Sequence, residues 1–355
     1  MKDKQYYKLL YLAKSSNDYK AQFQNLTEII ELINDIELYK DIHKRIIPLI
    51  KKKADKLDLF SLLSNETQQV LLAENNQAIV TEMIKQAQLI QIIKLFNAHN
   101  VSMILLKGMA FSSTLYSKKS PRISNDIDIL VKEKDWELAK EIICSIMEPL
   151  NINNTQVFDD LYESTFIPRG HVGAVVDLHK SLIHPILFKI DEKDIWDNSQ
   201  IVKEFDSENV RMLSPEHNLI HQAIHAYKDM DFCKYNLVDT YEIISILKPN
   251  IEKSITIASQ WGAKVPLYYL LSNCKSIMDA DIELKMINRL SPSLIIKYIA
   301  NKLLASKNSQ LVTKKKSISY RINQLVSQFI FTSSVIRPIN FQWLYLKTAI
   351  KQFKK

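Results

Sequence analysis

The sequence predicts an α+β protein that is predominantly helical and contains one small mixed sheet. The 355 residues include only four glycines, far below the roughly 7% of average proteins, which disfavours folds rich in tight turns. Apolar residues recur at three- and four-residue spacings through both ends of the chain, the pattern of amphipathic helices. Short strand-like runs are confined to the middle. We therefore expect an N-terminal helical region (1–99), an α/β core (100–212) and a C-terminal helical region (213–355).

The N-terminal region shows the helical pattern most clearly. The segments LTEIIELINDIELY and AIVTEMIKQAQLIQIIKLF carry apolar residues at helical spacing, and Pro48 is the single proline or glycine before residue 100. Ser64 precedes the second segment and is a candidate N-terminal cap. These features predict a bundle of helices up to about residue 98.

The central region alternates between strand and helix signals. VSMILL (101–106) is a short apolar run that ends at Lys107-Gly108, and it predicts a buried strand followed by a helix. DIDILV (126–131) alternates polar and apolar residues, as a strand does. Residues 133–147 are amphipathic and helical. Two further strands, near 165–168 and 174–182, flank a glycine-bearing turn, so we expect three or four strands.

The C-terminal region is helical and strongly basic. Ser214 followed by Pro215 is a good helix start. Glu283 is the last acidic residue, and 14 lysines and arginines follow it. These exceed the net charge of +8, so the chain up to Glu283 is net acidic. A basic region suits an anionic partner such as RNA, a nucleotide or a membrane surface. The alternative is a solvated basic face without a partner.

Several classes of protein are disfavoured by composition. Without a G-x-G-x-x-G or a G-x-x-x-x-G-K-[ST] motif, a Rossmann dehydrogenase, a P-loop NTPase or a protein kinase is not expected. We also expect no signal peptide and no transmembrane segment. Cys144, Cys233 and Cys274 are far apart and show no metal-like spacing. The sequence therefore predicts a cytoplasmic protein without disulfides.

Chemistry is concentrated between residues 105 and 131. Asp126 and Asp128 are two apart on a predicted strand, so both carboxylates project from one face. Such a pair repels unless a cation binds, and Mg²⁺ takes carboxylate and phosphate oxygens. Upstream, Lys107 and Gly108 stand between a strand and a helix, where backbone N–H groups favour phosphate. Arg122 is a second candidate phosphate ligand.

A third carboxylate follows on a later strand. Asp177 interrupts the apolar run AVVDLHKSL, and His179 lies on the same face. Because a buried acid is costly without a partner, Asp177 is a candidate metal ligand or proton acceptor. The alternative for Asp177 is pairing with a structural base. His179 is either a contact for the nucleotide substrate or a structural, hydrogen-bonded histidine.

The arrangement L-K-G-x-A…L-Y…P-R-x-x-x-D-I-D-I-L-V, followed by V-D-L-H-K, resembles the uncharacterised nucleotidyltransferase family of the DNA polymerase β-like superfamily. The resemblance is dense over residues 104–131 and shorter over 176–182, with a looser echo over 213–244. It implies that Asp126, Asp128 and Asp177 bind metal and that Lys107-Gly108 is the phosphate-side motif. Lysine agrees with this family, whereas other members of the superfamily have glycine-serine at this motif.

The resemblance implies a Mg²⁺-dependent nucleotidyltransferase that moves an NMP from an NTP to a hydroxyl or phosphate acceptor. One or two Mg²⁺ ions, or Mn²⁺ in their place, would serve. The acceptor could be RNA, a peptide or protein, or a small molecule, with the basic C-terminal region as a contact for an anionic acceptor. The alternatives are a phosphotransferase or glycosyl-type transferase on the same fold, and a non-catalytic nucleotide- or RNA-binding module.

Other polar residues are further candidates for the site. His217, His221 and His225 share one helix face. Their sequence lacks an H-E-x-x-H motif, so packing beside the cleft is the favoured interpretation over metal binding. Asp239 is a candidate for the lining of the same cleft, on analogy with the family alone.

Overall fold

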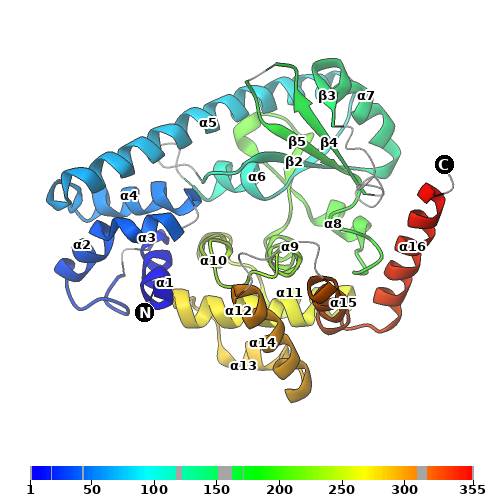
Figure 1. Ribbon diagram of the computed structural model, residues 1–355. Coiled ribbons are helices and arrows are strands. Elements are labelled where there is room, and N and C mark those ends of the chain that lie inside the picture. The colour runs from blue at the N-terminus through cyan, green and yellow to red at the C-terminus, as the bar shows by residue number, and fades with distance from the viewer. Residues whose placement is uncertain are drawn as a thin grey trace.

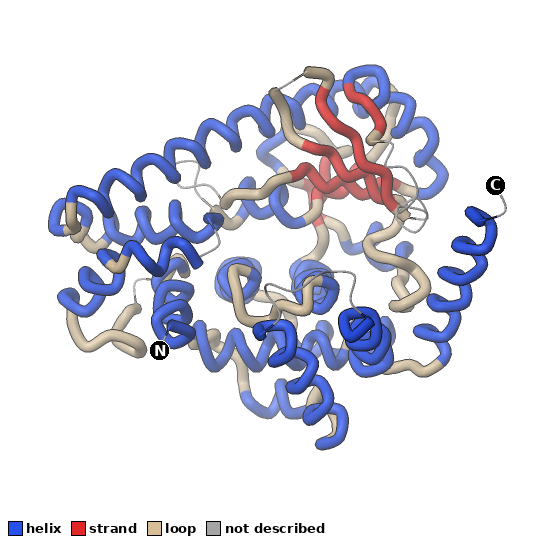
Figure 2. The backbone as a smooth tube through the Cα atoms, viewed as in Figure 1, coloured by secondary structure: helices blue, strands red, loops and turns tan. Residues whose placement is uncertain are grey.

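The chain forms a mostly helical molecule around one β-sheet, as the sequence predicts (Figures 1 and 2). A computed structural model describes residues 2–16, 18–41, 44–116, 122–150, 162–170, 172–309 and 318–353. The described helices run over Lys2–Ala13 (α1), Leu26–Asn34 (α2), Ile36–Asp41 (α3), Ile47–Lys56 (α4), Asn65–Ala98 (α5), Lys107–Thr114 (α6), Trp136–Ile146 (α7), Glu192–Asn198 (α8), Pro215–Lys228 (α9), Asn236–Glu242 (α10), Ile251–Trp261 (α11), Lys264–Met278 (α12), Leu284–Arg289 (α13), Leu294–Ser309 (α14), Ile318–Phe331 (α15) and Ile336–Phe353 (α16).

The strands gather in one mixed sheet (Figure 2). Within the described ranges it has seven strands in the order β3-β4-β5-β2-β1-β7-β6. At its centre β2 runs parallel to β5 and antiparallel to β1. The strands are Met103–Leu105 (β1), Asp126–Val131 (β2), Met147–Pro149 (β3), Glu163–Pro168 (β4), Val175–His179 (β5), Gln200–Ile201 (β6) and Val210–Met212 (β7).

The expectation of three or four strands is too low. The four that the sequence indicates are β1, β2, β4 and β5, and the last two pair antiparallel as expected. The additional strands β3, β6 and β7 are two or three residues long. A run this short cannot display the two-residue alternation by which a strand is recognised.

Helix α5 connects the N-terminal helices to the sheet region. It contains 34 residues and is therefore about 51 Å long at 1.5 Å per residue. Figure 1 shows it running along the upper side of the molecule, from above α4 to the sheet. It packs against α4 near one end and α7 near the other, so one rigid element spans both regions.

Helix caps form where the sequence predicts them. The Ser64 side chain accepts a hydrogen bond from the Thr67 amide at the start of α5. The Ser214 side chain does the same for the His217 amide at the start of α9, with Pro215 at the first helical position. Buried apolar side chains form one cluster that extends from Leu9 to Phe331. The division into three domains stays a prediction.

Candidate active site

Three carboxylates meet on one face of the sheet. Asp126 and Asp128 lie on β2, and Asp177 lies on the parallel neighbour β5, where it is paired in register with Asp128. Residues paired across neighbouring strands point to the same face. One oxygen from each carboxylate lies within 4.8 Å of the others. Three hard oxygen donors at this spacing fit a divalent cation such as Mg²⁺.

Asp128 is the most tightly held of the three. It is 5% exposed, and its Oδ1 lies 3.6 Å from Lys107 Nζ and 3.2 Å from His179 Nε2. Burial alone would raise the pKa of Asp128. The Lys107 charge and the His179 hydrogen bond outweigh burial and hold this pKa well below its usual range. Asp128 is therefore a carboxylate at any physiological pH.

For Asp177 the same kinds of effect have the opposite result, and its pKa is raised. Burial and the negative charges of Asp128 and Asp126 raise the pKa of Asp177, although a hydrogen bond from Thr165 opposes the shift. Thr165 Oγ1 donates to Asp177 Oδ1 at 2.6 Å from the paired position on β4. A cation between the carboxylates would relieve this repulsion.

His179 is held between two acids. Its Nε2 faces Asp128, and its Nδ1 lies 3.5 Å from Glu163 Oε2. Glu163 lies opposite His179 in the antiparallel β4–β5 pair. The Nε2 hydrogen bond orients Asp128, whereas Nδ1 lies near Glu163 without forming a hydrogen bond.

The junction between β1 and α6 lies beside the carboxylates. Lys107 has a φ of +38°, a strained value for a residue with a side chain. Gly108 is required by packing, because a Cβ there would lie 2.5 Å from Ser124 Cβ. The strained turn directs the Lys107 side chain toward Asp128, and the small glycine lets the next segment pass close by.

A buried lysine from α5 anchors that next segment. Lys85 Nζ donates to Ser124 Oγ at 2.6 Å and to the Ser124 carbonyl at 3.2 Å. Lys85 also forms a buried ion pair with Glu82 at 2.8 Å. Ser124 Oγ in turn donates to the Asp126 carbonyl. A residue 39 positions before Ser124 thus fixes the start of the strand that carries Asp126. Lys85 and Glu82 are not among the site residues that the sequence predicts.

Arg122 is paired with a distant acid. Its Nε and Nη2 donate to both oxygens of Asp239 at 2.6 to 2.8 Å, and both side chains are buried. Tyr116 adds a hydrogen bond to the same carboxylate at 2.8 Å. Arg122 still lines the cavity beside the carboxylates. Asp239 binds Arg122 and is not among the residues that line this cavity.

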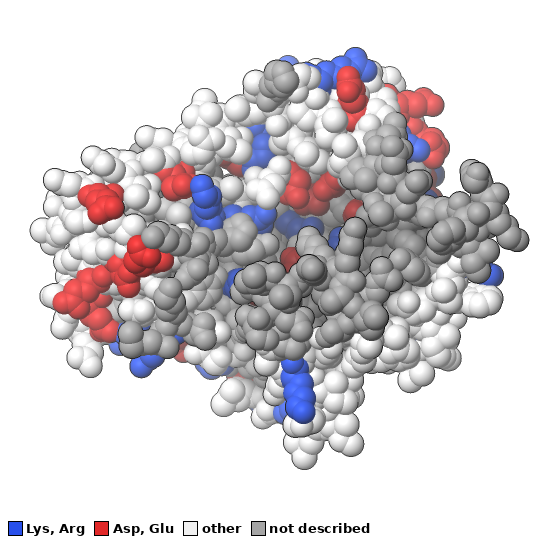
Figure 3. Space-filling model, in the orientation of Figure 1, with Lys and Arg blue, Asp and Glu red and all other residues white. Residues whose placement is uncertain are grey.

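Two neighbouring cavities reach the site. A polar cavity of about 190 Å³ contains Lys107, Gly108, Arg122, Asp126 and Asp128 on its walls. A larger one of about 560 Å³ is mostly apolar. Both have Lys107 and His225 on their walls. In Figure 3 acidic and basic side chains meet in a hollow in the middle of the visible face. The larger cavity also contains Glu163, His179, Leu187, Phe188, Tyr227, Gln328 and Phe341 on its walls.

The histidines of α9 pack beside the cleft, as the sequence favours. His217 is fully buried, stacks on Trp261 at 5.3 Å and contacts Asp194. His221 and His225 line the larger cavity. Among the described residues, the one cluster suited to a metal is the three aspartates.

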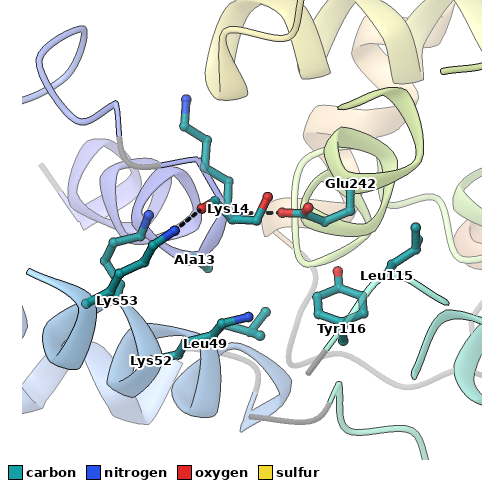
Figure 4. A pocket seen from close by; sticks show the side chains of 10 residues that line it. Ala13, Lys14, Leu49, Lys52, Lys53, Leu115, Tyr116 and Glu242 are labelled. Atoms are coloured by element: carbon teal, nitrogen blue, oxygen red, sulfur yellow. Dashed lines mark hydrogen bonds between the residues drawn. The ribbon is translucent and has the colours of Figure 1, made fainter. Parts of the chain in front are cut away.

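A separate pocket lies between α1, α4 and α10 (Figure 4). Its walls include Lys14, Lys53 and Glu242. Lys14 donates to the Met278 carbonyl at 3.2 Å, Lys53 donates to the Ser16 carbonyl, and Glu242 accepts from the Ser15 amide. At about 20 Å³ the pocket has room for about one water, which is too small for a substrate. These lysines therefore have a structural role: their hydrogen bonds join neighbouring helices.

Comparison with known proteins supports the resemblance. A family model described as "Uncharacterised nucleotidyltransferase" matches residues 41–279, which is more than half of the chain. No curated protein matches. Among solved structures, the crystal structure of JHP933 from Helicobacter pylori is similar over 66% of this chain and 96% of that one, with 12% identity and a TM-score of 0.28.

Proposed function

Because the chain belongs to the uncharacterised nucleotidyltransferase family, we propose that it is a Mg²⁺-dependent enzyme that transfers an NMP from an NTP to an acceptor. The observation that carries this proposal is the cluster of Asp126, Asp128 and Asp177 beside Lys107. Carboxylates and a cation placed together suit a metal-bound triphosphate.

The three aspartates would hold one or two Mg²⁺ ions, or Mn²⁺ in their place. When bound, the metal supplies charge neutralisation at the reacting phosphate. His179 and Lys107 keep Asp128 ionised and oriented for this role. Asp177, whose pKa is raised, is the member best suited to accept a proton from the acceptor hydroxyl.

The polar cavity is the proposed triphosphate site. Lys107 supplies a positive charge, and the amides at the start of α6 supply hydrogen-bond donors. Arg122 lines the same cavity, although its pairing with Asp239 makes it a fixed positive wall. Gly108 keeps the backbone close to the phosphates.

The larger cavity is the proposed acceptor site. It opens beside the same lysine, and aromatic and aliphatic side chains such as Phe188, Tyr227 and Phe341 line it. Among its described lining residues, the only lysines are Lys107 and Lys228. An acceptor with an apolar or aromatic part, such as a peptide or small molecule, fits this lining better than an RNA strand.

Radiolabelled NTPs test the proposal. With Mg²⁺ and a cell lysate as the source of acceptor, label at the α-phosphate should enter a product, while label at the γ-phosphate should leave as pyrophosphate. Asp126→Ala/Asp128→Ala should lower incorporation by about 10⁴-fold, the scale at which loss of a catalytic group acts. The matched control Glu137→Ala/Glu141→Ala removes two exposed carboxylates from α7 and should leave turnover unchanged.

Other outcomes would indicate a different function. Transfer of the γ-label would identify a phosphotransferase, and a product that gains a sugar would identify a glycosyl-type transferase. Salt-sensitive RNA binding without turnover of any NTP would identify a non-catalytic module. Full activity of the double aspartate variant would refute the metal site.

A further inference from the structure

Helix α16 carries an apolar stripe on its outer side. Ile336, Ile339, Trp343 and Leu346 are between 52% and 69% exposed. Their spacings of three, four and three residues place them within an arc of about 80° on a helix of 3.6 residues per turn. This is the pattern of a buried helix face, yet no described residue covers it.

The opposite side of α16 already contacts the protein. Phe341 packs its ring on His184 at 4.8 Å between centroids and lines the larger cavity. Pro338 is buried. Figure 1 shows α16 at the edge of the molecule, with its outer side facing away from the other helices. A helix that is apolar on both sides is stable in water only when both sides are covered. The stripe therefore indicates a second binding partner that covers it.

The charge around the stripe identifies the kind of partner. The chain has 14 basic residues and no acidic one after Glu283. Lys347 and Lys351 lie on α16 itself, whereas Arg337 donates to the Trp261 carbonyl on the side of α16 that faces the protein. Lys347 Nζ stands 5.3 Å from the Trp343 ring centroid. Tryptophan beside lysine, above an aliphatic stripe, is the composition of helices that lie in a membrane interface.

Other occupants fit less well. An RNA strand would bind the basic residues but leave Ile336 and Leu346 without an apolar partner. A second copy would bring two helices of the same positive charge together without any acidic residue after Glu283 to offset it. An anionic lipid surface satisfies both features, because acyl chains cover the stripe and head groups neutralise the lysines.

We propose that α16 docks its outer face on an anionic lipid bilayer, lying in the plane of the interface. No helix in the described ranges is long and apolar enough to span a membrane, which agrees with a surface location. The proposal does not depend on the proposed function, since the stripe lies on the side of α16 away from Phe341.

Vesicle sedimentation with the full chain tests the proposal. The protein should bind vesicles of phosphatidylcholine and phosphatidylglycerol (3:1) at least about tenfold more tightly than phosphatidylcholine alone, and salt should weaken the binding. Ile339→Asp/Trp343→Asp should reduce binding at least about tenfold. The control Val80→Asp/Met83→Asp changes two exposed apolar residues on α5 and should bind like the wild type.

Tryptophan fluorescence gives a second measurement that needs no destabilising variant. Of the four tryptophans, Trp136 and Trp261 are buried, Trp196 is half-buried and Trp343 is exposed. Anionic vesicles should therefore shift the emission to shorter wavelength, and Trp343→Phe should bind but lose the shift. The proposal would be overturned if the protein bound neutral vesicles equally well, or if the aspartate variant bound as the wild type does. It would also be overturned by a dimer or an RNA complex that the aspartate variant abolishes.

Discussion

The buried pair of Arg122 and Asp239 makes a quantitative prediction about stability. Three hydrogen bonds of 2.6 to 2.8 Å join them, and neither side chain is more than 7% exposed. Burial would lower the pKa of Arg122, but the Asp239 carboxylate raises it well above its usual range. Arg122→Met leaves a buried carboxylate without its partner, and we expect a loss of about 3–5 kcal/mol in the free energy of unfolding.

A double-mutant cycle in urea isolates the pair. Because Arg122→Met/Asp239→Leu removes both charges, it should cost less than the sum of the single changes, with coupling of at least about 2 kcal/mol. Lys193→Met breaks an exposed ion pair with Asp197 and should leave the free energy of unfolding nearly unchanged. If Arg122→Met cost no more than this control, the pair would not hold the segment before β2 against α10, contrary to this prediction.

Three further predictions concern the site and its surroundings. Gly108→Ala places a Cβ 2.5 Å from Ser124 Cβ and should destabilise by about 1–3 kcal/mol in thermal unfolding; an unchanged unfolding temperature would contradict this expectation. Lys107→Gly relieves the positive φ but removes the positive charge beside the buried Asp128 carboxylate, so it should lower stability by about 1–3 kcal/mol as well as turnover; a gain in stability would contradict it. Burial lowers the pKa of His184 from 6.5 to about 4, so the unfolded chain binds a proton that the folded chain does not. Stability should fall as the pH drops below 6.5, by about 2 kcal/mol at pH 5, and His184→Gln should remove that part of the pH dependence.

The long elements of the fold were predictable because their patterns repeat. The apolar spacing of AIVTEMIKQAQLIQIIKLF recurs over about five turns of α5, and DIDILV becomes β2 at the predicted residues. Strands β6 and β7 depend instead on tertiary pairing. Residues 200–201 and 210–212 become strands because they pair with one another and with β1, which no local pattern displays.

The residues of the site also fall into those that a local sequence pattern predicts and those that it does not. Asp126 and Asp128 are adjacent on one strand, so their common face follows from the sequence. The partner of Arg122 lies 117 residues away, beyond the reach of any local pattern. Lys85 and Glu82 did leave a signal, since both occupy the apolar face of α5 between Ala78 and Leu89. A charged side chain at a core position of a helix costs free energy unless it is paired. Ser124 is one of the groups that pair with Lys85.

On the proposed function, one cavity holds the groups that carry out the transfer, and the other determines which acceptor can bind. The carboxylates, Lys107 and His225 lie within residues 41–279, the part matched by the family model. Gln324, Gln328 and Phe341 form one wall of the larger cavity and come from α15 and α16, outside the matched part. On the proposed function, the family supplies the transfer machinery, and the last two helices of this chain shape the space that admits the acceptor. Helix α16 also carries Lys347 and the exposed stripe, so acceptor choice and attachment to a surface would reside in the same part of the chain.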